Sequence, residues 1–187
     1  MHFELIPAAY MEQELVQKLT AASSDIENEW FFFDGTFQVS SNIGLSVNSW
    51  LHENFVVVCN NEIIAYFEGY WERPRDVINS FRCINFSKNH SILATKALFK
   101  YFDYLFVNRG CKVLNWVVAL QNKHAIKQYD RFINHYCGHC VGILHHSQKS
   151  YTGKISDSCL YAITQEEYFQ WKLCGNKKSN KTVSIIE

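Results

Sequence analysis

The alternation of strand and helix patterns after residue 54 constrains the fold of this chain more than any other feature. Two apolar, β-branched runs at 55–59 and 62–71 are separated only by Asn60 and Asn61, which predicts a β-hairpin with a tight turn. A third strand pattern at 77–86 leads directly into a helical pattern that ends at Gly110. The apolar face of that helix is expected to contain Ala94, Ala97, Leu98, Tyr101, Phe102 and Leu105.

The rest of the chain continues the alternation. Residues 111–120 are rich in β-branched and aromatic residues, which predicts a central strand rather than a second helix. The further expected elements are a helix at 122–136, strands at 139–148 and 154–164, and a short helix at 165–173. Before residue 55 we expect an extended start at 2–7, a helix at 10–22 and a short helix near 44–53. This order predicts a single three-layer α/β domain with a mixed sheet.

The length and charge of the chain limit the classes of function. Its 187 residues suit one domain, expected at 1–173, followed by a flexible polar tail at 174–187. Lysine plus arginine and aspartate plus glutamate both total 18, so no positive surplus points to nucleic acid. The acidic N-terminus is unlike a signal peptide, and no segment approaches the roughly 18 consecutive apolar residues of a membrane span. We therefore expect a cytoplasmic protein that does not bind a membrane.

Cysteine and histidine cluster in residues 135–146, so a zinc site has to be considered. Cys137 and Cys140 have the spacing of the first pair of a zinc knuckle, and His145 stands where the third ligand would fall. The fourth position holds Ser150, which is a poor zinc ligand, so a tetrahedral site would not close. The segment instead has strand composition, with alternate side chains expected on opposite faces. The cysteines are scattered and odd in number, which predicts reduced buried thiols and no metal site.

Two motifs in the second half of the chain resemble those of one enzyme family. Residues 122–129 carry the pattern Asn-x-x-Ala-x-x-x-Tyr at a helix start, and 153–161 carry Gly-x-x-x-Asp-x-x-x-Tyr on the last strand. In these motifs and in its element order the chain is similar to GNAT-type acyl-CoA N-acyltransferases, most of all to the branch of ribosomal-protein N-acetyltransferases and their phage and bacterial relatives. The resemblance implies a mostly antiparallel sheet of about seven strands, splayed between the fourth and fifth, here between 79–86 and 112–119.

The resemblance assigns roles to the helix at 122–136. Asn122 and Tyr129 are seven residues apart, about 10 Å of helical rise, so their side chains lie on one face. By resemblance, Asn122 and Ala125 contact the cofactor acetyl-CoA along its pantetheine arm, and the Tyr129 hydroxyl protonates the departing thiolate. The alternative from the residues alone is that Asn122 caps the helix and Tyr129 is a core aromatic.

The segment expected to bind the pyrophosphate departs from the family pattern. The usual Gln/Arg-x-x-Gly-x-Gly/Ala loop aligns with residues 89–94, where only the final small residue, Ala94, is retained. Anion binding at a helix N-terminus needs free N–H groups more than glycine itself. Candidate donors remain at Lys88, Asn89, His90 and Ser91. The alternatives are that Asn89 or Ser91 simply caps the helix, or that the chain is a catalytically inactive GNAT-fold binding module with a degenerate CoA site.

The family mechanism implies direct attack of an amine on acetyl-CoA within a ternary complex, without an acyl-enzyme intermediate. Backbone N–H groups around Cys83 and Ile84 would polarise the thioester carbonyl. Glu68 and Glu72, on and just after the third strand, are the candidate bases, although carboxylates in such places often only keep a protein soluble. No His/Asp arrangement accompanies Cys83, so we interpret it as a buried thiol rather than a nucleophile.

The acceptor stays open between a small-molecule amine, a peptide N-terminus and a protein lysine. Residues 30–34, together with Tyr70, Trp71 and Glu72, could form an aromatic-walled pocket for a cationic amine. The core is the commoner place for such aromatic runs. The sequence thus predicts an N-acetyltransferase that modifies a primary amine, and whether it forms a homodimer stays open.

Overall fold

The computed structural model describes residues 2–23, 52–72, 76–150 and 153–174, and for Lys88 only the backbone. The described strands form one seven-stranded sheet in the order β1-β2-β3-β4-β5-β7-β6. The strands are β1 (Glu4–Pro7), β2 (Phe55–Cys59), β3 (Glu62–Glu72), β4 (Val77–Asn85), β5 (Val113–Ala119), β6 (His139–Lys149) and β7 (Ile155–Thr164). The helices are η1 (Ala8–Met11), α1 (Glu12–Ser23), η3 (Lys88–His90), α2 (Ser91–Asp103), η4 (Tyr104–Asn108), α3 (Lys123–His135) and α4 (Gln165–Cys174). The predicted α/β architecture is confirmed.

The N-terminal strands follow the expected pattern. β2 and β3 pair antiparallel, and Asn60 and Asn61 between them have φ values of 51° and 62°. A type I′ turn needs both central residues in this left-handed region, which asparagine tolerates better than most residues. The expected helix near 44–53 and the aromatic run at 30–34 fall on 24–51, outside the described residues. His52, at the start of the second described range, forms a β-bridge with Tyr70.

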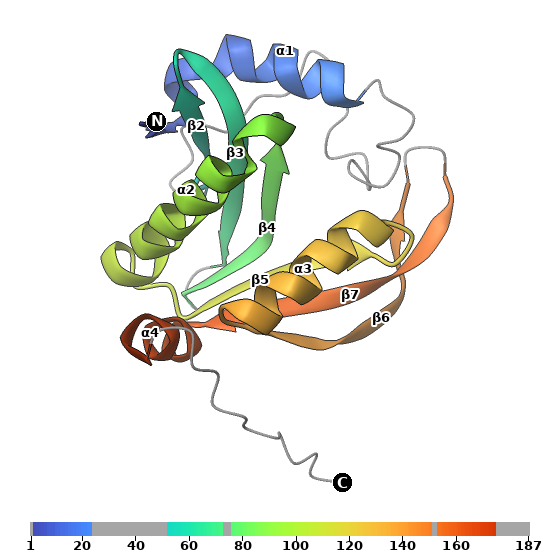
Figure 1. Cartoon of the computed structure of the whole chain (residues 1–187). Helices are drawn as coiled ribbons and strands as arrows, with labels where there is room; N and C mark the ends of the chain where they lie inside the picture. The colour runs from blue at the N-terminus through green and yellow to red at the C-terminus, as the bar shows by residue number, and fades with distance from the viewer. Residues whose placement is uncertain (1, 24–51, 73–75, 151–152, 175–187) are drawn as a thin grey trace, which may run out of the picture.

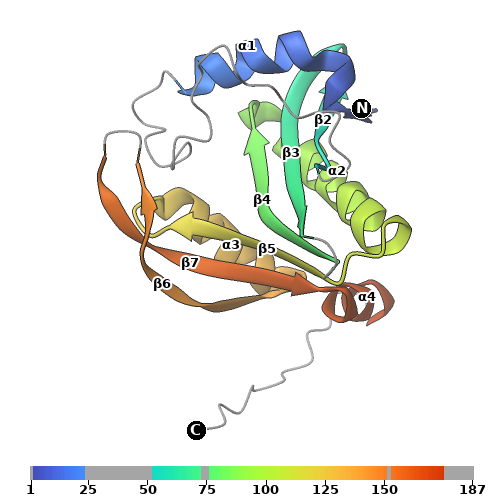
Figure 2. The same ribbon diagram turned by 180° about the vertical axis from the view of Figure 1, so that it is seen from behind.

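The sheet is splayed between β4 and β5, as the family resemblance implied. These two strands are parallel and are paired only at Val77 with Val113 and at Ile78 with Leu114. The other neighbouring strands pair antiparallel. Figures 1 and 2 show β4 and β5 diverging from this junction, with α2 beside one strand and α3 beside the other. We call the diverging part, residues 79–85 of β4 and 115–119 of β5, the splay.

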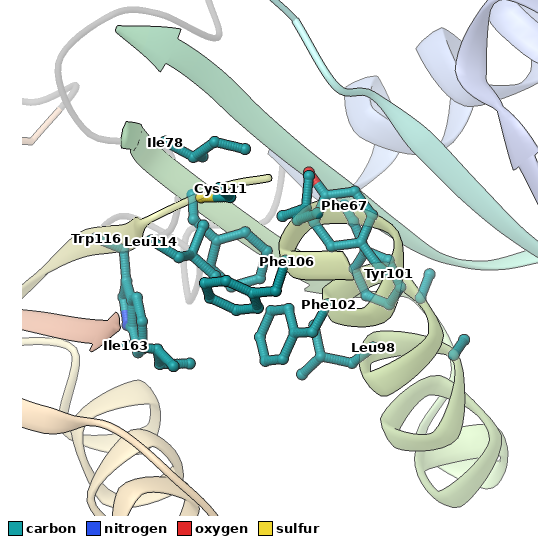
Figure 3. Close-up of a cluster of buried hydrophobic side chains, with 14 of the residues drawn as sticks. Phe67, Ile78, Leu98, Tyr101, Phe102, Phe106, Cys111, Leu114, Trp116 and Ile163 are labelled. Carbon is teal, nitrogen blue, oxygen red and sulfur yellow. The ribbon is translucent and has the colours of Figure 1, made fainter. Parts of the chain in front are cut away.

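The helices form two layers around the sheet. α1 packs on one face, against a cluster that includes Tyr66 and Ile84. α2, α3 and α4 pack on the other face, where Phe67 and the aromatic residues of α2 form the main core (Figure 3). The predicted apolar face of α2 is confirmed, since all six of its residues are buried. The helix then continues as the π-helical turn η4, and Gly110 follows with a φ of 72°.

β6 is less regular than predicted. Its pairing with β7 shifts register between Cys140 and Gly142 and again between Leu144 and Gln148. The expected strict alternation of side chains is therefore wrong for this strand. Within the described ranges, no group of three or more His, Cys, Asp and Glu side chains could hold a metal ion. Each described helix is too short or too polar to cross a bilayer, and α4 extends one residue past the expected domain boundary at 173, with 175–187 outside the described residues.

Candidate active site

The backbone of Cys83 faces the splay. The Phe86 N–H donates to the Ile64 carbonyl of β3 at 2.9 Å, and the register from Glu68 opposite Arg82 onward is regular. Neighbouring residues of an antiparallel strand direct their N–H and C=O groups to opposite sides. The backbone groups of Ile84 therefore point to β3, and those of Cys83 point towards the splay. Of the two residues expected to polarise a carbonyl, Cys83 is the better oriented.

Tyr129 of α3 lies near Cys83 on the other side of the splay. Burial raises the pKa of its hydroxyl well above the ordinary value, and the neighbouring Cys83 adds to the rise. The Tyr129 ring contacts Trp116 of β5 and Tyr161 of β7, with centroid distances of 5.2 and 5.7 Å. Burial also raises the pKa of the Cys83 thiol to about 12. At neutral pH this pair is a phenol and a thiol, which suits an acid better than a nucleophile.

Trp116 and Phe81 fill the region where β4 and β5 begin to separate. Their ring centroids are 5.7 Å apart, and Trp116 is 2% exposed. Its Nε1–H is buried and has no hydrogen-bond partner among the described residues. Buried N–H groups are usually paired, so this donor is available to a molecule bound beside Tyr129.

The N-terminus of α2 is open to an anion. Its N-cap is His90, whose side chain makes no capping hydrogen bond, and its first turn has no acidic residue. The His90 Nδ1 instead lies 2.8 Å from Ser87 Oγ. The expectation that Asn89 or Ser91 caps this helix is therefore wrong. The side chain of Ala94 is buried in the core, so only its backbone could approach a phosphate.

Asn122 is the N-cap of α3. Its Oδ1 accepts a hydrogen bond from the Ala125 N–H at 3.0 Å, which is the capping arrangement considered from the sequence. An asparagine amide also carries two donors on Nδ2. Capping therefore does not prevent Asn122 from binding a ligand carbonyl, while Ala125 packs half-buried against the core.

The two candidate bases lie at different heights on β3. Glu68 is opposite Arg82, and their charged groups are 3.7 Å apart. Glu72 is opposite Val77, where β4 and β5 are still paired, and it accepts a hydrogen bond from a neighbouring asparagine. Six strand residues, about 20 Å, separate Val77 from Cys83. The structure thus places Glu68, but not Glu72, beside the β4 segment that contains Cys83.

Solved structures with this architecture identify the fold. An assigned acetyltransferase from T. thermophilus superposes with a TM-score of 0.69 at 14% sequence identity, with 93% of this chain and 92% of that chain covered. A chimera of the spermidine N-acetyltransferase SpeG from Vibrio cholerae and hSSAT gives a TM-score of 0.66 at 16% identity, covering 91% and 99%. This chain has the GNAT acetyltransferase fold. No protein-family model and no curated protein matches its sequence, and membership of the ribosomal-protein branch stays a prediction.

Within this GNAT fold, Trp71 belongs to the core rather than to a pocket wall. It is fully buried, and its Nε1 donates to the Glu53 carboxylate at 2.8 Å. Glu53 also accepts hydrogen bonds from Tyr104 at 2.9 Å and from Arg109 at 2.7 Å. The sequence analysis missed this buried carboxylate, because Glu53 precedes the first clear strand and pairs with residues about fifty positions away. Tyr70 is 41% exposed and stays a candidate for acceptor binding.

The second family motif supports the GNAT fold through side-chain hydrogen bonds. Asp157 of β7 accepts from the His146 N–H at 2.8 Å and lies 3.0 Å from His145 Nδ1, which fixes the irregular part of β6. Tyr161 donates to the Asp130 carboxylate of α3 at 2.8 Å. These contacts hold β6, β7 and α3 together, so the motif helps to position Tyr129.

Proposed function

We propose that this chain is an N-acetyltransferase that moves an acetyl group from acetyl-CoA to a primary amine. The observation that carries the proposal is the approach of the Tyr129 hydroxyl to Cys83 across a splay into which the Cys83 backbone projects. A carbonyl-polarising N–H and a proton donor are thus brought to one place by two different elements. Acyl transfer from a thioester requires these two groups.

The residues around the splay fit acetyl-CoA as the co-substrate. The unpartnered Trp116 Nε1–H and the amide of Asn122 offer donors to the pantetheine arm. The uncapped N-terminus of α2, beginning at Ser91, offers N–H groups and a favourable helix dipole to the pyrophosphate. Further donors for the phosphates come from the preceding turn, at Lys88, Asn89 and His90. Small side chains at Ala94 and Ala125 allow close approach of the chain to the cofactor.

The proposed reaction is a direct transfer. The amine nitrogen bonds to the thioester carbon while the Cys83 N–H stabilises the developing negative charge on oxygen. The carbon–sulfur bond then breaks, and the Tyr129 hydroxyl gives its proton to the departing thiolate. Because the pKa of Tyr129 is raised, the hydroxyl keeps its proton at neutral pH until the thiolate forms.

Glu68 is the favoured base for the amine proton. It lies one β4 position from Cys83 in the sheet register and is held beside Arg82. Alternating side chains put Glu68 on the α1 face of the sheet with Tyr66, the face opposite Tyr129. Acid and base would then approach the thioester from opposite faces, with a water relaying the proton to Glu68. The position of Glu72 makes it the weaker candidate.

A small-molecule amine is the first acceptor class to test, because one structural neighbour is named a spermidine N-acetyltransferase. A peptide N-terminus and a protein lysine are the other classes for the same assay. Calorimetric titration with acetyl-CoA, compared with desulfo-CoA and 3′-dephospho-CoA, should show saturable binding that Asn122→Ala weakens. Acetylation of a panel of amines should then depend on Tyr129. Binding without transfer to any amine class would favour the non-catalytic module, and absence of binding up to millimolar concentration would exclude CoA as the ligand.

A further inference from the structure

The proposed reaction leaves one pair of reactive groups unused, the thiols of Cys140 and Cys159. Cys140 is exposed on β6, and Cys159 is 5% exposed on β7. Their Sγ atoms are 2.8 Å apart, close enough that a small shift would bring them to the about 2.05 Å of a disulfide bond. Cys137, which forms the Cys-x-x-Cys pattern with Cys140, is buried separately in the core. The sequence pattern thus pairs Cys140 with the wrong partner, and the fold gives it Cys159 instead.

We infer that Cys140 and Cys159 form a reversible disulfide when the protein meets hydrogen peroxide, which makes the β6–β7 pair an oxidative modification site. The exposed Cys140 sulfur attacks a peroxide oxygen and becomes a sulfenic acid, while the other oxygen leaves as water. The Cys159 sulfur then attacks the Cys140 sulfur and displaces a second water. Two thiols and one peroxide thus give one disulfide and two waters, and a small dithiol reverses the step.

The environment of the two thiols gives them different roles in this sequence. Burial, with a smaller contribution from Cys140, raises the pKa of the Cys159 thiol to about 12. Cys159 is therefore a poor first nucleophile, and accessible Cys140 reacts first. A metal is a poorer explanation for the pair, since two thiols alone do not complete a tetrahedral site and the described residues contain no larger ligand group.

The pair is connected to the proposed active site through β7. The Cys159 and Tyr161 side chains are hydrogen-bonded, and Tyr161 donates to Asp130 of α3. The residue before Asp130 is Tyr129, whose ring contacts Tyr161 at 5.7 Å. Oxidation removes the Cys159 thiol from this chain of contacts, so we expect it to change the rate of acetyl transfer. This consequence, unlike the disulfide itself, rests on the proposed function.

Peptide mapping tests the disulfide independently of activity. The full chain is treated with hydrogen peroxide, alkylated under denaturing conditions and digested with trypsin. The expected product joins residues 132–149 to 155–172. Because Cys137 and Cys140 share the first peptide, Cys137→Ser is the matched control and should still form the cross-link, whereas Cys140→Ser and Cys159→Ser should not. All variants also carry Cys174→Ser, since that exposed cysteine could link two molecules.

Three outcomes would overturn the inference: a cross-link that depends on Cys137, a sulfinic acid on Cys140 with Cys159 still free, or a cross-link that dithiothreitol does not reverse. Acetyl transfer is then compared before and after oxidation in the Cys137→Ser and Cys140→Ser proteins. A rate that changes only in Cys137→Ser supports the connection to Tyr129, and an unchanged rate in both overturns it. If no variant transfers acetyl groups at all, the proposed function fails while the mapping result still stands.

Discussion

α2 and α3 lie on the same face of the sheet on either side of the splay, but the core holds them differently. α2 buries five residues: Ala94, Ala97, Leu98, Tyr101 and Phe102. In α3, which the structure describes in full, no residue is classed as buried, and side chains such as Phe132 are only half-buried. The comparison teaches that one helix carries the stability of this region, whereas the other presents reactive groups at the edge of the core.

The largest expected difference is in stability. Phe102 of α2 is 1% exposed and packs among the rings of Phe81, Phe106 and Tyr168. Phe102→Ala should lower the free energy of unfolding by about 3–5 kcal/mol because it leaves a cavity. Phe132→Ala should cost roughly 1–2 kcal/mol, since less apolar surface is buried there. Urea denaturation of both variants measures the difference, and equal losses would contradict the comparison.

The exits of the two helices offer a matched pair of glycines. Gly110 and Gly138 both have positive φ values, 72° and 94°. A Cβ at Gly110 meets nothing within 4 Å, but one at Gly138 would lie 2.7 Å from the Ala162 carbonyl oxygen. Gly110→Ala should cost about 1–2 kcal/mol from backbone strain alone. Gly138→Ala should cost about 2–4 kcal/mol, because displacement of β7 adds to that strain. Thermal unfolding of both variants would reveal a smaller loss at Gly138 if the contact were relieved elsewhere.

The next expected effect is on catalysis. Tyr129→Phe should lower the rate of acetyl transfer about 100-fold while the free energy of unfolding changes by less than about 1 kcal/mol. Tyr136→Phe, another half-buried aromatic near the end of α3, is the control and should retain activity. Because burial raises the pKa of Tyr129, the hydroxyl stays protonated as pH passes the ordinary tyrosine value of about 10. A Tyr129-dependent loss of rate below that pH would refute its role as the acid.

The smallest expected effect concerns Asp157. Hydrogen bonds from the His146 N–H and then from His145 lower its pKa below the usual 3.8. A carboxyl whose folded-state pKa is depressed contributes stability above its unfolded-state pKa and loses it as pH falls through the folded-state value. Asp157→Asn should therefore lower Tm by no more than a few degrees at pH 7. The gap to the wild type should shrink between pH 5 and pH 2, and a gap that widens on acidification would have the wrong sign.

Local patterns predicted most of the fold. The hairpin turn at Asn60 and Asn61 and the apolar face of α2 depend on neighbours within a few residues, so they could be read from the sequence. The irregular course of β6 could not be predicted in this way. It is fixed by Asp157, eleven or more residues away on β7, and an alternating pattern contains no sign of that hydrogen bond.

The candidate site was less predictable than the fold. The family resemblance supplied Tyr129, and the structure brings its hydroxyl close to Cys83. It also listed Glu68 and Glu72 together, although the register places them at different heights on the sheet. The cap of α2 is His90 rather than Asn89 or Ser91, because the short η3 turn precedes the helix. The buried Trp116 N–H was missed, since only packing in three dimensions leaves it without a partner among the described residues.

The brief pairing of β4 with β5 has a consequence for how such a protein can change over evolutionary time. Only two residue pairs join the strands, so beyond Ile78 their spacing depends on the size of side chains such as Phe81 and Trp116. One substitution at either position can widen or narrow that spacing without breaking a single sheet hydrogen bond. New acyl chains or amines can therefore be accommodated by point mutation, while the rest of the sheet keeps its register.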